Sequence, residues 1–259
     1  QLDDDTMIIG TSGRYEFKNK GINVYLEALN RLTRDKNLKK DVLAFINVPG
    51  WVGEVREDLR ERLDSGKDYD TPLECPFITH WLHNMSHDQV LDMLKYLNMS
   101  NSVDTKVKVV FVPCYLDGKD GILNELYYDL LIGTDLSVYP SYYEPWGYTP
   151  LESIAFKVPT ITTDLAGFGL WVNSLTGKNA TLQDGVKVIH RTDYNYSEVA
   201  DTIKDTISEF SSLTSTEINK IRKNAANIAE KALWKHFIQY YYEAYDIALR
   251  NAAKRLSLN

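Results

Sequence analysis

The chain has 259 residues, 44% of them hydrophobic and 25% charged, which is typical of a globular protein with a sizeable core. Its net charge of -7 argues against nucleic acid, an anionic membrane or a polyphosphate as the main partner. The two cysteines, Cys75 and Cys114, form neither a metal-ligand spacing nor a disulfide framework. No apolar run approaches the length of a transmembrane helix. We therefore expect a reduced, cytoplasmic compartment.

Strands alternate with helices as far as about residue 195. Apolar runs predict strands at residues 7–10, 42–46, 107–112, 136–139, 158–162 and 186–189. Helical patterns lie between them, at residues 22–34, 86–97, 122–132 and 149–156. This alternation predicts an α/β fold, a Rossmann-like parallel sheet with helices on both faces, whose site lies beyond the carboxyl ends of the strands. The polar segment 52–76 is expected to be an insertion between strands.

The last part of the chain, residues 197–259, is expected to be a helical C-terminal segment of a single domain that covers residues 1–259. Its three predicted helices span residues 198–210, 216–233 and 234–250. The third carries an aromatic stripe on one face, made by Trp234, Phe237, Tyr241, Tyr245 and Leu249. Exposure of such a stripe would favour self-association, so a homo-oligomer is one possible assembly.

The stretch SYYEPWGYTP, residues 141–150, is the most informative part of the sequence. Together with the Leu151-Glu152 that follows, it places two carboxylates, Glu144 and Glu152, around a sharp turn between a buried strand and a helix. Unpaired N–H groups and the helix dipole make such a helix start a binding site for phosphorylated ligands. A ligand that has both phosphate and sugar hydroxyls fits carboxylates at these two positions.

The same residues also have a purely structural interpretation. Thr149 is a good N-cap, Pro150 fits the first helical position, and Glu152 completes a capping box. Glu144 can likewise be a turn residue before Pro145. Both interpretations stay open at this point.

Two cations follow the first predicted strand. Arg14 can hold phosphate oxygens with two hydrogen bonds, and Lys20 adds a point charge. They lie at the same end of the sheet as Glu144, although solvated surface residues are the alternative. Neither a Walker-type glycine loop nor a GxGxxG motif is present.

The spacing of Glu144 and Glu152, E-x7-E, resembles the signature of retaining glycosyltransferases with two facing Rossmann-like domains, the GT-B architecture. The runs SYYEPWGYTP and GRYEF-x-NKG, the latter at residues 13–21, are similar to glycogen synthases of the animal and fungal type. Weaker matches are PFITH at residues 76–80 and LAGFG at residues 165–169, with Ala166 in place of the family's serine.

The resemblance runs from about residue 8 to residue 249 and corresponds to the C-terminal, nucleotide-sugar-binding half of such an enzyme. It implies that the other half, an N-terminal Rossmann-like domain with the acceptor site, is a missing partner. Residues 197–259 would cross back to that domain. The chain alone is then expected to be inactive.

The resemblance also implies roles for individual residues. Glu144 would orient the donor glucose and support the charge that develops at its anomeric carbon, while Arg14 and Lys20 hold the diphosphate. Glu152 would bind the ribose. Tyr127 is a candidate platform for the base, or else an ordinary helix tyrosine. The remaining donor-binding residues lie in the turn, with backbone N–H groups that face the distal phosphate: Trp146, Gly147, Tyr148 and Thr149.

The implied reaction is transfer of glucose from a nucleotide sugar, with UDP-glucose favoured over ADP-glucose, to the non-reducing end of an α-1,4-glucan acceptor with retention of configuration. No metal or other cofactor is expected, and His80, His83 and His87 lack an acidic partner at a suitable spacing. Two alternatives remain: a retaining glucosyltransferase with another acceptor, and a non-catalytic module that binds nucleotide or glucan.

Regulation is expected to differ from that of the animal and fungal enzymes, whose arginine-rich helix senses glucose 6-phosphate. The corresponding residues, 217–231, contain Arg222 with Lys220, Lys223 and Lys231 as their only other cations. One arginine makes a poor phosphate cluster, so we expect weak activation or none.

Overall fold

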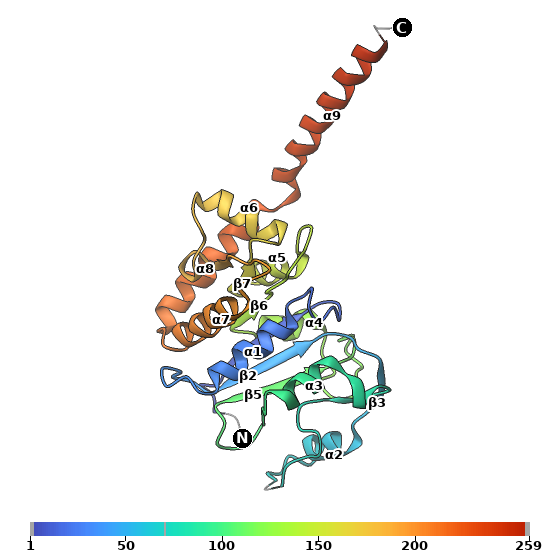
Figure 1. The fold of residues 1–259 in the computed structure, drawn as a ribbon, viewed down its shortest axis with the longest axis vertical. Coiled ribbons are helices and arrows are strands. Elements are labelled where there is room, and N and C mark those ends of the chain that lie inside the picture. Colours follow the sequence, from blue (N-terminus) through green and yellow to red (C-terminus); the bar gives the residue numbers. More distant parts are fainter. Residues whose placement is uncertain (1–2, 70, 257–259) are drawn as a thin grey trace.

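The computed structural model describes residues 3–69 and 71–256. Six strands form a central sheet in which every neighbouring pair is parallel. They are β1 (Met7–Ser12), β2 (Val42–Asn47), β5 (Val107–Val112), β6 (Leu136–Val138), β7 (Thr160–Thr163) and β8 (Val186–Ile189). Helices surround this sheet (Figure 1), so the predicted α/β class and all six predicted strands are confirmed.

The order of the strands locates the place where a ligand can bind. It is β5-β2-β1-β6-β7-β8, so the chain runs outward from β1 on one side and later returns to continue on the other side. β1 and β6 therefore flank the point at which the strand order reverses. In open α/β sheets the ligand crevice lies at this point, outside the carboxyl ends of the strands. Ser12, at the end of β1, contacts the Tyr139 hydroxyl just after β6 at 3.3 Å.

The helices bury apolar faces against the sheet and against one another. α1 (Ile22–Leu32) is the most buried, with Tyr25, Leu26 and Leu29 fully enclosed, and it packs against α7 (Tyr196–Ser211). Each fully buried side chain of this size contributes about 1.5–3 kcal/mol. The other helices are α2 (Glu57–Ser65), α3 (Gln89–Tyr96), α4 (Tyr127–Ile132), α5 (Tyr148–Ala155), α6 (Gly167–Thr176), α8 (Ser215–Lys231) and α9 (Trp234–Leu256), with single 3-10 turns at Met85–His87 and Leu182–Asp184.

One predicted helix begins later than expected. The pattern at residues 122–132 predicts a helix over its whole length, but α4 covers only its second half. The carboxylate of Asp120 accepts hydrogen bonds from the N–H groups of Ile122, Leu123 and Asn124, at 2.7–3.0 Å, and holds these residues in a turn. Asn124 also adopts a left-handed conformation with φ 54°, which ends any helical path there.

The predicted insertion at residues 52–76 is partly regular. β3 (Val52–Val55) pairs antiparallel with β4 (His80–Leu82), and α2 lies between them in sequence. Arg56 anchors the segment, because its fully buried guanidinium binds the Cys75 carbonyl and stacks over Trp81 at 4.5 Å. The sequence did not predict this small sheet, since β4 is three residues long and the residues around it are polar.

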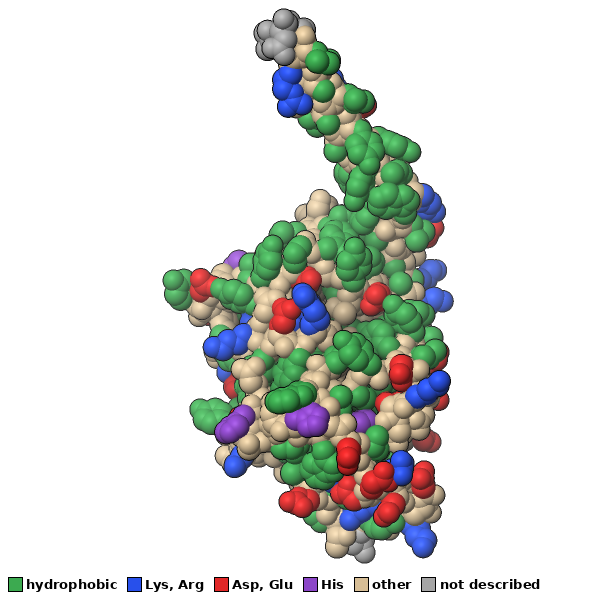
Figure 2. Space-filling model, turned by 90° about the vertical axis from the view of Figure 1, so that its right-hand side faces the viewer, with side chains coloured by type: hydrophobic (Ala, Val, Ile, Leu, Met, Phe, Trp, Pro, Cys, Tyr) green, Lys and Arg blue, Asp and Glu red, His purple; other side chains and the backbone are tan. Residues whose placement is uncertain are grey.

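The three C-terminal helices occur where they were predicted, but they differ in how they pack against the rest of the molecule. α7 and α8 pack on the body of the molecule, whereas α9 projects from it and buries none of its residues (Figure 1). Hydrophobic side chains cover much of the projecting helix (Figure 2). Four residues of the predicted stripe are exposed, namely Trp234, Tyr241, Tyr245 and Leu249. None of the described helices, α9 included, is long and apolar enough to span a membrane.

Candidate functional site

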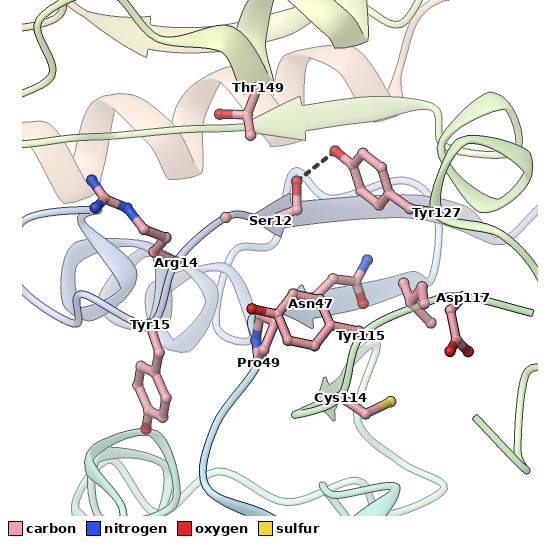
Figure 3. Close-up of a pocket in the computed structure, with 12 residues that line it drawn as sticks. Ser12, Arg14, Tyr15, Asn47, Pro49, Cys114, Tyr115, Asp117, Tyr127 and Thr149 are labelled. Atoms are coloured by element: carbon pink, nitrogen blue, oxygen red, sulfur yellow. Dashed lines mark hydrogen bonds between the residues drawn. The ribbon is translucent and has the colours of Figure 1, made fainter. Parts of the chain in front are cut away.

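A pocket of about 550 Å³ opens at the carboxyl ends of β1, β2 and β5, beside the reversal of strand order. Its walls include Ser12, Arg14, Asn47, Tyr115, Tyr127 and Thr149, which are labelled in Figure 3. The volume is in the range of ligand and cofactor sites. The prediction of a site at this edge of the sheet therefore agrees with the hollow that the structure contains.

Lys20 and Glu144, which are 124 residues apart, form an ion pair through a short contact between Nζ and Oε2. Both side chains are mostly enclosed, with 14% and 18% of their surface exposed. The backbone of Glu144 is fixed as well, because its N–H donates to the Leu165 carbonyl at 3.3 Å and its carbonyl accepts from Gly167 at 3.0 Å. The structure thus brings together two of the three predicted catalytic residues from two different loops.

Arg14, the third predicted catalytic residue, lies in the wall of the pocket (Figure 3). Its side chain is 76% exposed and contacts Glu16 at 3.1 Å. An exposed arginine whose ion pair is with a half-buried carboxylate near the surface can change its rotamer at little cost. The guanidinium can therefore move onto an anion that enters the pocket.

The start of α5 differs from the predicted capping box. The helix begins at Tyr148, its N-cap is Gly147, and no side chain caps it. Gly147 has φ 108°, a conformation open to glycine, so the helix starts before Thr149 can act as the N-cap. The capping interpretation of Thr149 and Glu152 is therefore wrong. The first N–H groups of α5 have no side-chain acceptor and keep their capacity to bind an anion.

Glu152 makes a different contact from the one that the capping box requires. Its carboxylate accepts a hydrogen bond from the Tyr128 hydroxyl at 3.1 Å, and its charge raises the pKa of that phenol. The Tyr128 ring packs between Tyr127 at 5.3 Å and Phe156 at 5.2 Å. Glu152 lies one helical turn from the start of α5, next to the tyrosines of α4, rather than in the wall of the pocket.

Tyr127 lines the pocket, as a base platform would. Its hydroxyl hydrogen-bonds to Ser12 at 2.7 Å (Figure 3), and burial raises the pKa of the phenol. A second ring that was not predicted, Tyr115, lines the same pocket and is 79% exposed. Its position three residues after β5 was the available signal, since residues that follow parallel strands meet at one edge of the sheet.

Trp146, like Gly147 and Tyr148, lies outside the lining of the pocket, and its ring packs among other aromatic rings. Its ring lies 5.6 Å from Trp171 and 5.4 Å from Phe237, which is in the first turn of α9. It also meets Phe168 edge-on at 6.0 Å. The ring is thus part of an aromatic cluster that supports the turn, and it does not line the pocket.

A histidine, a cysteine and an aspartate lie close together behind Tyr115. The potential ligand atoms of His80, Cys114 and Asp120 are within 4.8 Å of one another. His80 Nε2 donates to the Asp120 carbonyl at 2.7 Å, and its Nδ1 is bonded to Thr79 Oγ1 at 2.9 Å. Burial, with the nearby Asp120, raises the pKa of the Cys114 thiol to about 12. These hydrogen bonds give the cluster a structural role, because they hold the loop that carries Tyr115.

The glycogen synthase family model matches residues 59–256 of the chain. The chain belongs to the glycogen synthase family. Curated relatives include glycogen [starch] synthase isoform 2 of Saccharomyces cerevisiae, 27% identical over 95% of this chain and 43% of that protein. Glycogen [starch] synthase of Caenorhabditis elegans is also 27% identical, over 95% of this chain and 44% of its own length. The chain therefore spans less than half the length of these glycogen synthases.

Solved structures agree on the fold. An α,α-trehalose-phosphate synthase (UDP-forming) from Burkholderia vietnamiensis superposes with a TM-score of 0.54 at 10% identity, and the match covers 95% of this chain and 46% of that one. At this identity the likeness concerns the fold alone. It confirms that this glycogen synthase family chain has the fold of one half of a GT-B glycosyltransferase.

Proposed function

We propose that the chain is the nucleotide-sugar-binding half of a retaining glycogen synthase. The complete enzyme would transfer glucose from UDP-glucose to the non-reducing end of an α-1,4-glucan. The observation that carries this proposal is the enclosed Lys20–Glu144 pair beside a pocket at the reversal of strand order. A cation and a carboxylate at one point match a donor in which a phosphate is joined directly to a sugar.

The donor would lie along the pocket. The base stacks against the exposed ring of Tyr115 and the ring of Tyr127. The ribose hydroxyls would reach beyond the wall of the pocket toward Glu152, and the diphosphate would meet Arg14, Lys20 and the uncapped start of α5. The glucose then lies against Glu144, which exchanges its contact with Lys20 for the sugar hydroxyls.

Retention requires that the diphosphate leave and the acceptor arrive on the same face of the glucose. The bond between the anomeric carbon and the distal phosphate oxygen breaks, and the acceptor 4-hydroxyl oxygen forms the new bond. The hydroxyl proton passes to the departing phosphate, so UDP and the extended glucan are the products. The protein supplies positions and charges rather than a nucleophile.

We further propose that transfer needs no metal ion, since two cationic side chains and a helix N-terminus meet the negative charge of the leaving diphosphate. Addition of EDTA to the full-length protein is expected to leave kcat within about twofold, because the cations that stabilise the leaving group are part of the chain. The assay compares EDTA with its magnesium complex as a control. A loss that magnesium restores would contradict the proposal.

We expect glucose 6-phosphate to have little effect on activity. Arg222, on α8, is already engaged with the carboxylate of Asp135 at 3.2 Å and the Thr134 carbonyl at 3.4 Å. A lone arginine that already pairs with a carboxylate through one guanidinium nitrogen binds a phosphate weakly. Initial rates of the full-length protein with and without glucose 6-phosphate should agree within about twofold. Activation of about tenfold or more would show that another phosphate site exists.

The remaining half of the polypeptide would cover α9. Its exposed rings, Trp234, Tyr240, Tyr241 and Tyr245, form an apolar surface that a larger protein would bury. We propose that the rest of the enzyme, with the acceptor site, binds this surface, and that self-association replaces it in the isolated chain. We also propose a cytoplasmic location, which agrees with the unpaired Cys75 and Cys114.

Nucleotide binding tests the proposed donor site. In calorimetric titrations of the full-length protein we expect UDP to bind more tightly than ADP. Arg14→Ala should remove about 3 kcal/mol of transition-state stabilisation, measured as kcat/KM, because a charge-stabilising donor is lost. Glu152→Ala should weaken UDP binding about tenfold through loss of the ribose contact.

Arg34→Ala is the matched control for Arg14→Ala. Arg34 is also an exposed arginine, but it follows the far end of α1 and binds Asn30 at 2.8 Å. Its replacement should change neither binding nor turnover. If neither nucleotide binds a folded full-length protein, or if Arg14→Ala keeps near-normal turnover, the proposed site is wrong.

A further inference from the structure

Arg191 is a buried arginine at the carboxyl edge of the sheet, just after β8. It is 5% exposed, and its backbone N–H donates to Asp164 Oδ1 at 2.9 Å. Its guanidinium donates to the Pro140 carbonyl and lies over the Tyr142 ring at 5.4 Å. None of the ion pairs among the described residues includes Arg191, and burial lowers its pKa. Burying a cation without a carboxylate partner costs free energy of folding, so a functional role would explain an arginine at this position.

The partners of Arg191 belong to the loop that leads to Glu144, and that loop is pressed against the loop that carries Lys20. Gly21 has φ 71°, and a Cβ atom there would lie 2.0 Å from the Pro140 carbonyl oxygen and 2.9 Å from Arg191 Nη1. The Tyr142 N–H also donates to the Asn19 carbonyl at 2.7 Å. Arg191 therefore stands where residues 13–21 and 140–147 meet.

Lys20 directly precedes Gly21, and Glu144 lies two residues after Tyr142. We propose that Arg191 is a positioning residue that sets the spacing between the Lys20 ammonium and the Glu144 carboxylate. This inference rests on the proposed function for its kinetic consequence, although its structural consequence is independent of it. The flat guanidinium suits the task because it can donate to a carbonyl in its plane while its face packs on a ring.

The kinetic test is a double-mutant cycle in the full-length protein. Arg191→Met is expected to lower kcat by about 30- to 100-fold, with the donor KM within about threefold, because the reacting groups are misplaced rather than lost. In a Glu144→Gln background the same change should cost less than about threefold, since the residue being positioned is already disabled. Equal losses in both backgrounds would show a merely structural role and overturn the proposal.

Two further variants keep the test interpretable. Arg191→Lys retains the charge and one donor but not the flat fork, so it should recover about tenfold of the activity lost in Arg191→Met. It also serves as the test variant if Arg191→Met does not fold, and wild-type kcat in Arg191→Lys would overturn the requirement for a guanidinium. Arg34→Met, an arginine replacement outside the three loops, should leave kcat unchanged.

A crystal structure of the variant separates this inference from the proposed reaction. Loss of the Lys20–Glu144 contact in Arg191→Met or Arg191→Lys, with the sheet intact, is the expected result. An unchanged contact would overturn the positioning role whatever the activity. The loop could move in the variant while the wild-type protein transfers no glucose. That result would support the positioning role and reject the proposed function.

Discussion

Glu144→Gln in the full-length protein is expected to lower kcat by about 10²- to 10³-fold, the cost typical of removing one preorganised charge-stabilising group. The carboxylate is enclosed, is aligned by backbone bonds to Leu165 and Gly167, and faces Lys20. Glutamine keeps the shape of the side chain but removes the negative charge that stabilises the positive charge developing on the glucose. UDP affinity should change little, because the nucleotide contacts are made by other residues.

The measurement is steady-state transfer to glycogen together with a UDP titration of each variant. Glu198→Gln, at an exposed position in the first turn of α7, makes the same chemical change away from the pocket and should behave like wild type. A Glu144→Gln enzyme with kcat within about threefold of wild type would exclude charge stabilisation by Glu144.

Gly167→Ala is expected to reduce kcat by about 100-fold, because small misplacements of reacting groups are this costly. A Cβ atom at Gly167 would lie 2.2 Å from the Pro145 carbonyl oxygen, and that backbone must then move. Gly167 also donates its N–H to the Glu144 carbonyl at 3.0 Å. The added methyl group therefore pushes on the loop that holds the catalytic carboxylate, at a cost to stability of about 1–3 kcal/mol.

Turnover and thermal unfolding should be measured on the same samples. Gly133→Ala is the matched control, since Gly133 has a negative φ of -77° and its nearest neighbour would be the Leu130 carbonyl oxygen at 3.4 Å. It should cost little in either measurement. Normal kcat in Gly167→Ala would mean that the loop yields without moving Glu144, and the role of Gly167 as its support would be rejected.

Much of the fold was predictable because its strands are buried on at least one face. A nearly continuous apolar run such as residues 107–112 is typical of a strand in the interior of a parallel sheet. The meeting of Lys20 and Glu144 was also predictable, since both follow strands and the carboxyl ends of parallel strands share one edge. This step works although the two residues are 124 positions apart in the sequence.

Other features depend on contacts that the sequence does not display. Thr149 has the chemistry of an N-cap, but the left-handed conformation of Gly147 starts α5 before Thr149. Glu152 therefore accepts a hydrogen bond from Tyr128 instead of completing a capping box. The late start of α4 follows from the turn around Asp120. Arg191 gave no signal at all, because its importance arises only when three separate loops are folded together.

Transfer of glucose to glycogen with retention can be tested by NMR of the product. The full-length protein is given glycogen and UDP-glucose labelled with carbon-13 in the sugar. We expect release of UDP and immediate appearance of label in α-1,4-linked, non-reducing terminal glucose. Label in a β-linkage would contradict retention, and transfer to no glucan would contradict the assignment of the chain to a glycogen-forming enzyme.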